Sequence, residues 1–390
     1  MQVHEWTSVR RRLARAGVGL MVGLSAIGLA ACGSDSGDAG AATAAAPAKS
    51  DAAKDAAIAE LTKRPTRIAV SEPIGKPVPS GKTITLVPTP IIDPKPSLKI
   101  LEEAAAVLGW KANMVVPTNS STAALGQAID EAVRQQTDAI VMVSFPGSAL
   151  RAPIGRAADA GIPVVNMNAS EPAGSVPGIT AQPLGQEYLL RVAEKTGEMM
   201  GLLVPEGSTV GEAALLVITK ADAIQQATEK GVKTTCPSCS YKPHITLAAQ
   251  AKDYVPNMVN FIRKEELAGL YIMNGPLSNG LGPAMRATGI DPSSVAALAG
   301  TINGADGSAA RVQKGEAPLA AGYVWPAAEG LWYGVDAAAR ALAGVSAKAS
   351  ETTPDPYIVL PGEVPADVLE NPTTTTVLDY KAQCAELWGK

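Results

Sequence analysis

Residues 137–170 read TDAIVMVSFPGSALRAPIGRAADAGIPVVNMNAS, and this stretch decides the fold. The apolar run 139–143 is too short for an ordinary helix and is bounded by polar and turn-forming residues, so it predicts a strand buried on both faces. Residues 149–160 carry apolar side chains at helical spacing, Gly161 provides the cap that ends the helix, and a second β-rich run follows at 162–165. Strand, helix and strand in this order predict a βαβ unit of a parallel sheet.

The same alternation extends on both sides of this unit. From Lys82 to about residue 345, short apolar runs alternate with amphipathic segments, and a turn-rich break lies at 170–182. The pattern predicts two successive α/β halves, each with its own parallel sheet. Ligands bind at the carboxyl ends of such strands. In the βαβ unit these ends are Ser144-Phe145 and Asn166-Met167-Asn168.

The N-terminus differs in kind from the rest of the chain. Four arginines precede an apolar segment at 18–29, and small residues lead to Cys32, so residues 1–31 are predicted to be a secretory signal peptide. The sequence Leu29-Ala30-Ala31-Cys32 resembles the bacterial lipobox, which implies that Cys32 is lipidated and becomes the mature N-terminus. A plain secretory signal with an incidental cysteine is the alternative. Residues 32–64 are then expected to form a flexible tether followed by a short helix.

Composition and charge narrow the range of partners. The chain has 390 residues, 46% of them hydrophobic, and a formal net charge of −4, which becomes about −7 when residues 1–31 with four arginines and one glutamate are removed. No basic block remains, so a nucleic acid is not expected as a partner. The sequence shows no second apolar segment of spanning length, and the lipid is therefore expected to be the only membrane attachment.

The spacing of the cysteines is consistent with export from the cell. Cys236 and Cys239 flank Pro-Ser in a polar stretch, and outside the cell such a close pair is most simply a disulfide. A redox motif is one alternative, and a metal site formed with His244 is another, although no fourth ligand is evident. Cys384 is left unpaired and is expected to be a buried thiol.

Three phrases carry a resemblance to a known family: Thr137-Asp138-Ala139-Ile140-Val141, Ala160-Gly161-Ile162-Pro163-Val164-Val165 and Tyr271-Ile272-Met273-Asn274. With the order of elements, they resemble the type I periplasmic binding protein family, in its sugar-type branch of ABC-transporter lipoproteins. The stretch Ile68-Ala69-Val70-Ser71-Glu72-Pro73, ahead of the first strand, resembles an actinobacterial subgroup of that branch. The resemblance implies an α/β fold of two Rossmann-like lobes with parallel sheets, joined by a multi-strand hinge of three crossovers. It implies the following division: first lobe 82–170 with 304–325 returning to it, second lobe 182–303 with about 326–360 returning to it, and an irregular tail at 361–390.

The resemblance also implies a ligand held at the strand ends of both lobes. The matching positions are Thr89, Pro90, Ile91, Ser144, Phe145, Asn168, Asn274, Asn303, Tyr323 and Trp325. Sugar-binding members carry an Asp-Arg pair where this chain has Asn168-Ala169, and the aromatic rings common after the first strand are missing. Loss of these charge-assisted contacts favours a neutral, partly apolar small molecule. The alternative is a sugar held by residues one or two positions away.

The sequence gives little support for a catalytic function. His244 is the one histidine left after removal of the signal, and the sequence has no HExxH motif, phosphate loop or GxGxxG turn, so no catalytic residues, metal or cofactor are predicted. The expected function is that of a monomeric, lipid-anchored extracytoplasmic protein that captures a small molecule and delivers it to an ABC permease in the membrane. A ligand-sensing lipoprotein that presents its ligand to a membrane receptor and a secreted hydrolase are the alternatives.

Overall fold

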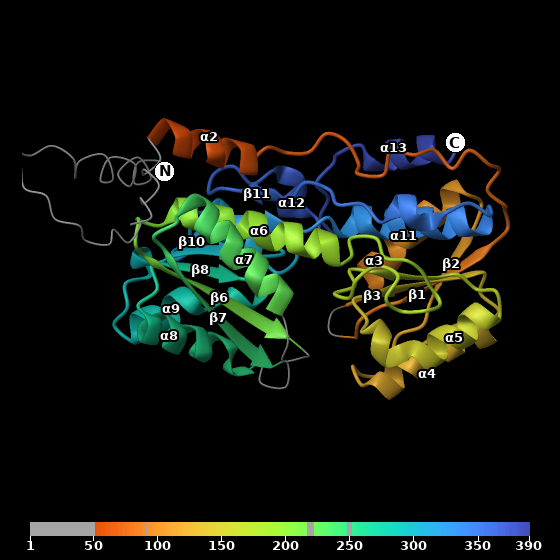
Figure 1. The fold of residues 1–390 in the computed structure, drawn as a ribbon, viewed down its shortest axis with the longest axis horizontal. Helices are drawn as coiled ribbons and strands as arrows, with labels where there is room; N and C mark the ends of the chain where they lie inside the picture. The colour runs from red at the N-terminus through yellow and green to blue at the C-terminus, as the bar shows by residue number, and fades with distance from the viewer. Residues whose placement is uncertain (1–50, 91–92, 217–221, 248–251) are drawn as a thin grey trace, which may run out of the picture. The chain divides into compact units, whose positions relative to one another are not determined.

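The computed structural model describes residues 51–90, 93–216, 222–247 and 252–390, and these residues contain two separate sheets (Figure 1). Cys32 and the predicted signal peptide lie outside them, as does the tether up to residue 50. The described chain begins with α2 (Asp51–Leu61), the short helix that the sequence predicts. The α/β fold with two parallel-sheet lobes is confirmed.

The first sheet has five parallel strands in the order β2-β1-β3-β4-β5. The strands are β1 (Thr83–Val87), β2 (Lys111–Met114), β3 (Ala139–Val143), β4 (Val164–Met167) and β5 (Ile179–Ala181). Residues 139–142 of β3 are fully buried, which agrees with the continuous apolar run from which this strand was predicted. In Figure 1 one face of this sheet is covered by α3 (Lys95–Val107) and α11 (Ala327–Leu342), and the other by α4 (Thr122–Arg134) and α5 (Arg151–Asp159).

The second sheet repeats this order and adds an antiparallel strand. Its order is β11-β10-β9-β8-β6-β7. The strands are β6 (Thr209–Leu216), β7 (Ser240–Leu247), β8 (Gly269–Ile272), β9 (Ala296–Ala299), β10 (Leu319–Val324) and β11 (Tyr357–Val359). The helices around it are α6 (Gln186–Leu203), α7 (Asp222–Thr235), α8 (Tyr254–Glu265), α9 (Leu281–Ala287), α10 (Ser308–Gln313) and α12 (Ala366–Glu370). In both lobes the order of the parallel strands is therefore 2-1-3-4-5, typical of a doubly wound fold.

Small residues let α6 and α7 approach each other closely. A Cβ atom on Gly197 would lie 2.2 Å from the carbonyl oxygen of Thr228, and a Cβ atom on Gly231 would lie 2.0 Å from the carbonyl oxygen of Glu194. Both distances are far below van der Waals contact, and the atoms approached belong to the backbone, which cannot rotate away. Glycine at these positions is therefore required for the packing of the two helices.

The predicted lobe boundaries are partly wrong. Residues 304–325 were expected to return to the first lobe, but β10 pairs with β9 of the second sheet. Residues 326–342 were expected in the second lobe, but α11 packs on α3, β3 and β4 of the first. The reason is topological, because β10 occupies the fifth position of the second sheet and completes it before the chain crosses. We refer below to the first lobe as residues 82–181 with α11, and to the second lobe as residues 186–324 with β11 and α12.

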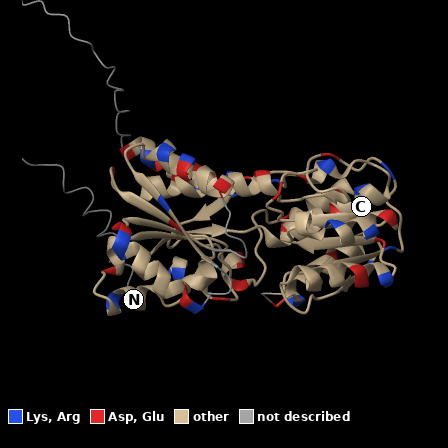
Figure 2. Cartoon of the chain, turned by 60° about the horizontal axis from the view of Figure 1, so that its bottom comes forward, with Lys and Arg blue, Asp and Glu red and all other residues tan. Residues whose placement is uncertain are grey.

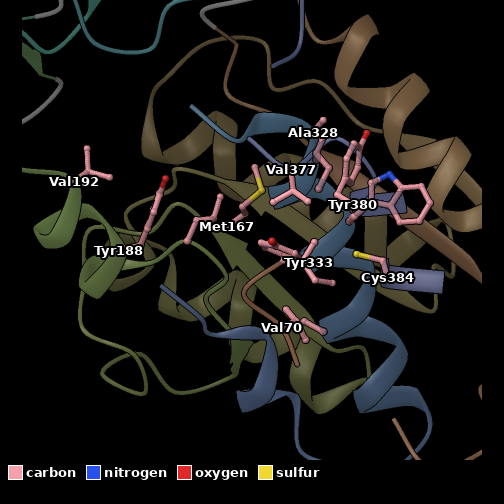
Figure 3. Packing of buried hydrophobic residues seen from close by; sticks show 14 of the residues in the cluster. Val70, Met167, Tyr188, Val192, Ala328, Tyr333, Val377, Tyr380 and Cys384 are labelled. Carbon is pink, nitrogen blue, oxygen red and sulfur yellow. The ribbon is translucent and has the colours of Figure 1, made fainter. Parts of the chain in front are cut away.

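The C-terminal tail is not irregular, which corrects a further expectation. It contains α12, which packs near α10, and α13 (Tyr380–Leu387), which packs on α11. The indole of Trp388 stacks on Trp332 with ring centroids 5.3 Å apart. Figure 3 shows Tyr380 and Cys384 next to the side chains of α11 that fill this core. Aromatic side chains, rather than helical periodicity, hold the tail in place.

Two buried carboxylates on α11 bind the terminal segments. Glu329 is fully buried and accepts hydrogen bonds from the hydroxyl group of Thr375 (2.6 Å) and the backbone N–H of Val377 (2.8 Å). Further along the helix, Asp336 accepts from the indole N–H of Trp388 (2.8 Å) and pairs with Arg340 at 2.7 Å. Buried carboxylates are stable only when they are hydrogen-bonded in this way, so the tail is part of the folded unit.

The terminal segments add to the three crossovers that the resemblance implies. The chain passes between the lobes from β5 to α6, from β10 to α11, and from the short helix η5 (Ala347–Ser350) to β11. In the described part it passes twice more: α2 contacts α6 before residues 68–81 join the first lobe, and the chain runs from α12 to α13. The two terminal segments also bond to each other, because the N–H of Ile74 donates to the carbonyl oxygen of Leu387 at 2.9 Å.

Candidate functional site

The carboxyl ends of the strands supply the candidate site. The strand order reverses between β1 and β3 in the first sheet and between β6 and β8 in the second, and ligands of doubly wound folds bind at such switch points. In Figure 1 the arrowheads of β6 and β7 point toward the first lobe. Residues 91–92, 217–221 and 248–251, which follow β1, β6 and β7, lie outside the described residues, and with them the predicted ligand residue Ile91.

Backbone strain concentrates at these strand ends. Among the described residues, six non-glycine residues have a positive φ angle, and two of them only end helices α4 and α8. The other four are Ser144 (60°), Asn168 (58°), Leu184 (50°) and Thr301 (51°). Three of these follow β3, β4 and β9, and Leu184 lies in the crossover from β5 to α6. Strained backbone of this kind clusters at binding sites because the surrounding structure must hold it in place.

Ser144 and Asn168 are brought together, as the sequence predicts for neighbouring strands. The side-chain amide of Asn168 donates to the hydroxyl oxygen of Ser144 at 2.6 Å. The Oδ1 atom of Asn168 is shielded from solvent and has no hydrogen-bond partner among the described residues. The Ser144 side chain is exposed. The pair therefore presents a hydroxyl group that can donate to a ligand and an amide oxygen that lacks a donor.

Phe145 is not available to a ligand, which corrects the prediction. Its side chain is 2% exposed and packs in the core beneath α4 and α5. Its backbone carbonyl oxygen accepts from the side chain of Asn166 at 3.0 Å. The reason is the left-handed conformation of Ser144, which turns the chain so that the ring of Phe145 enters the core instead of the strand-end edge.

Tyr323 is likewise a buried residue and not a ligand-facing one. It is 1% exposed, and its hydroxyl group is 2.6 Å from that of Tyr188 on α6. Burial raises the pKa of both tyrosines far above the ordinary value, so both stay neutral. Trp325 is half-buried and contacts Tyr188, with ring centroids 5.6 Å apart at an angle of 53°. Of the three predicted aromatic residues, Phe145, Tyr323 and Trp325, only Trp325 keeps an accessible surface.

In the second lobe, Asn303 is used by the fold itself. Its Oδ1 atom accepts from the backbone N–H of Ala305 (2.9 Å) and of Asp306 (3.2 Å), and its side-chain amide donates to the Asp306 carboxylate. This is an Asx turn, so the side chain has little capacity left for a ligand. Asn274 is half-buried directly after β8, and its carbonyl oxygen accepts from Leu277 to begin a short 3-10 helix. Thr89 and Pro90, which follow β1, are half-buried.

Arg311 is a residue that the sequence analysis missed. It lies on α10, and its guanidinium group is 3.5 Å from the hydroxyl of Ser278 and 3.5 Å from the carbonyl oxygen of Asp306. Its Nε atom is shielded and has no hydrogen-bond partner among the described residues. The long side chain thus brings a cation to the loops that follow β8 and β9. The only sequence signal was its position one turn into the helix after β9.

The cysteines form the predicted disulfide. Cys236 and Cys239 are bonded, with Cα atoms 5.3 Å apart, and both are buried. His244 stacks on Phe261 at 5.0 Å, and burial lowers the pKa of its imidazole. Cys384 is a buried free thiol, as expected, and burial raises its pKa. No cluster of three or more metal-ligating side chains occurs in the described ranges.

The distribution of charged residues and the hydropathy of the helices give two further observations. Figure 2 shows lysine, arginine, aspartate and glutamate intermingled along the helices, while the strands are mostly uncharged. Among the residues that the structure describes, no helix combines the length and apolar character needed to cross a membrane.

A comparison with known protein families gives a match over most of the chain. The profile of the periplasmic binding protein domain matches residues 95–346, about two thirds of the chain. The chain belongs to the periplasmic binding protein family. Members of this family bind solutes and are not enzymes, and membership implies a location outside the cytoplasm. The sequence matches no curated protein.

Solved structures of this fold are similar to this periplasmic binding protein. One is a periplasmic ribose ABC transporter protein from Conexibacter woesei, with a TM-score of 0.60 and 16% identity over 73% of this chain and 94% of the other. Another is a solute-binding protein from Agrobacterium vitis bound with α-D-tagatopyranose, with a TM-score of 0.59 and 18% identity over 72% and 94%. A third is the glucose-galactose binding protein GanP from Geobacillus stearothermophilus, with a TM-score of 0.57 and 16% identity over 72% and 98%. At these identities the likeness concerns the fold.

Proposed function

We propose that this periplasmic binding protein is an extracytoplasmic lipoprotein that captures a small neutral molecule for an ABC importer and delivers it to the membrane permease. The single observation that supports this most is the pair Ser144 and Asn168. Both residues have strained backbone at neighbouring strand ends, and the amide oxygen of Asn168 lacks a partner among the described residues. A ligand hydroxyl or amine group would provide the missing hydrogen bond.

The ligand class follows from the groups that remain accessible. The first lobe offers a hydroxyl and an amide, and Trp325 offers an apolar face on which a ring or a sugar face can stack. These groups suit an uncharged molecule with few hydroxyl groups, or a sugar. Sugars are bound by the similar proteins from Agrobacterium vitis and Geobacillus stearothermophilus. Arg311 in the second lobe would contact an electronegative atom of the same ligand.

Capture would couple binding to movement of the lobes. A ligand that contacts the strand ends of both lobes gains part of its contacts only when the lobes are closed, so its binding shifts the equilibrium toward the closed form. Tyr188 and Tyr323 lie where the first and second crossovers meet the second lobe, and their hydroxyl groups bond to each other. This neutral, buried pair would keep the hinge region fixed while the lobes rotate around it.

The anchor would be the lipid on Cys32. A tether of the length of residues 33–50 would keep a monomeric binding protein close to its permease and raise its effective concentration there. Replacing Cys32→Ser should move the protein from the detergent phase to the aqueous phase in a Triton X-114 partition. Equal partition of the two proteins into the detergent phase would argue against lipidation.

The ligand class is tested by a thermal-shift panel of pentoses, hexoses and small neutral aromatic compounds. A compound present at 100 times its Kd stabilises the folded state by about 2.7 kcal/mol, which gives a rise in Tm of several degrees. The variant Asn168→Gly keeps the positive φ angle but removes the side chain, and it should weaken binding of the active compound about 3–10-fold. An unchanged Kd in this variant would contradict the placement of the site.

A further inference from the structure

A cavity lies away from the strand ends, between the extended N-terminal segment and a crossover. Its volume is about 420 Å³, within the range of small-molecule sites. It is lined by residues 65 and 67–69 of the N-terminal segment and by residues 351–355, which connect η5 to β11. A smaller cavity of about 70 Å³ lies on the other side of residues 351–353 and is bounded by residues of the first crossover, including Gln182 and Gly185.

Two charged groups of opposite sign line the larger cavity without an ion-pair partner. Glu351 is half-buried and forms no salt bridge in the described part of the chain. Arg67, on the N-terminal segment, is exposed and likewise forms no ion pair with any described residue. Asp355, the third charged residue, is already paired with Arg191. The cavity is thus lined by one acid and one base without an ion-pair partner among the described residues, from two segments far apart in the sequence.

Further groups show that the polar lining is incomplete. The Oγ1 atom of Thr352 is shielded from solvent and has no hydrogen-bond partner among the described residues. Burial raises the pKa of the Glu351 carboxyl, and the hydrogen bond from the backbone N–H of Gln182 and the charge of Lys348 offset this effect only in part. A bound cation next to Glu351 would compensate the charge of its carboxylate.

We propose that this cavity binds a small zwitterion, an amino acid with a free ammonium group placed at Glu351 and a free carboxylate placed at Arg67. Residues 65–69 and 351–355 both lie outside the 95–346 region that matches the family, so the lining of this cavity is not part of the matched domain. It is separate from the strand-end site and does not depend on the ligand proposed there.

Occupation of the cavity would act on the hinge. The Oε1 atom of Glu351 accepts from the backbone N–H of Gln182 at 2.9 Å, which joins the third crossover to the first. A ligand held between Arg67 and Glu351 would also join the N-terminal segment to the first and third crossovers. Three of the five passages between the lobes would then be linked through one molecule, and the amino acid would change how readily the lobes open and close.

The test is isothermal titration and thermal shift with glycine, L-alanine and L-serine, with methylammonium and acetate as half-molecules at equal ionic strength. The expected result is a rise in Tm of at least 2 °C with an amino acid at 20 mM and less than 0.5 °C with either half-molecule. Arg67→Gln and Glu351→Gln should each weaken amino-acid binding at least tenfold. Glu316→Gln, at an exposed site in the loop before β10, is the matched control and should bind as the unchanged protein does.

Three results would overturn the proposal. The first is no shift above 0.5 °C with any of the three amino acids. The second is binding that survives both Arg67→Gln and Glu351→Gln. The third is binding lost in Asn168→Gly but retained in Glu351→Gln, which would place the amino acid at the strand ends. Because Arg67 is exposed, Arg67→Gln is expected to fold even if Glu351→Gln does not.

Discussion

The two lobes share a strand order but fill the same core position with different chemistry. Pairing in register aligns Leu86 of β1 with Val141 of β3, and the corresponding pair in the second sheet is Glu212 of β6 with Tyr271 of β8. Leu86 packs in an apolar core, whereas Glu212 is a fully buried carboxyl that accepts from the hydroxyl of Tyr241 at 2.6 Å.

The helices above these positions differ as well. In the second lobe α6 and α7 touch backbone to backbone through glycines. In the first lobe, a Cβ atom added to Gly155 of α5 would meet no other atom within 4 Å. One topology therefore accepts two kinds of interior, and only between α6 and α7 of the second lobe do the glycines compared here bring two helices into backbone contact. Substitutions in the two lobes test this difference.

Gly231→Ala should have the largest effect on stability. The added methyl group would lie 2.0 Å from the carbonyl oxygen of Glu194, so α6 and α7 must separate, at a cost of about 3 kcal/mol or more. Thermal or urea unfolding measures the change. The matched control is Gly155→Ala in the first lobe, which meets no neighbour and should stabilise its helix by about 0.5–1 kcal/mol. Equal effects of the two substitutions would remove the contrast between the lobes.

Removal of the disulfide should have the second largest effect on stability. The double variant Cys236→Ser with Cys239→Ser opens a loop of only four residues, for which the chain-entropy estimate is about 2 kcal/mol. The loss should appear in urea unfolding and should disappear when both proteins are compared under reducing conditions. Cys384→Ser, which breaks no covalent bond, is the control. A double variant as stable as the parent protein would show that the loop is held by other contacts.

Glu212→Gln should raise stability in a pH-dependent way. Burial, opposed by hydrogen bonds from Tyr241 and Thr228, raises the pKa of the Glu212 carboxyl above its ordinary value of 4.5. The folded state therefore holds a proton that the unfolded state releases, and stability falls as pH rises from 4.5 toward the raised pKa, by about 1.4 kcal/mol for each unit of pKa shift. Glutamine keeps the acceptor for Tyr241 and carries no charge.

The measurement for this variant is Tm between pH 4 and pH 8. Glu212→Gln should equal the parent protein near pH 4 and exceed it near pH 8. A constant difference at all pH values would mean that the carboxyl does not titrate differently in the folded and unfolded states. The control Glu316→Gln, at an exposed site, should give parallel curves.

Asn303→Ala should have the smallest effect on ligand binding. Its side chain is engaged in the Asx turn, so its loss should alter the Kd of the captured solute less than about threefold, while Asn168→Gly weakens it more. Titration of both variants with the active compound of the thermal-shift panel gives their Kd values, which show which lobe contributes more to ligand affinity. The reverse ranking would assign the main polar contact to the second lobe.

Much of the fold could be predicted because the deciding signal is local. The strand Ala139–Val143 and the helix after it appear in the structure, and the strand predicted at residues 162–165 appears two residues later, as Val164–Met167. Continuous apolar segments and a glycine cap leave few alternatives. The lobe to which α11 belongs could not be predicted, because an apolar helix pattern does not say which of two sheets it covers. The helices of the C-terminal tail could not be predicted for a similar reason, because the burial of the tail depends on single aromatic contacts such as that of Trp388 with Trp332.

The candidate site was harder to predict than the fold. Ser144 and Asn168 were found because parallel strands in sequence order bring their ends together. Phe145 was misjudged because one left-handed residue reverses the direction of the next side chain, and a serine carries no sequence signal for that conformation. Arg311 was missed because a long side chain reaches the strand ends from a helix rather than from the loop itself.

The two carboxylates of α11 bear on how this protein can be cut for laboratory work. The family match begins at residue 95, after the interior strand β1, and stops at residue 346, before every tail residue that donates to Glu329 or stacks on Trp332. A recombinant fragment trimmed to those limits would lose the strand that joins β2 to β3, and Glu329 and Asp336 of α11 would lose their hydrogen-bond partners in the tail. The smallest unit that should express in soluble form is residues 51–390, so sequence similarity alone draws this domain too short.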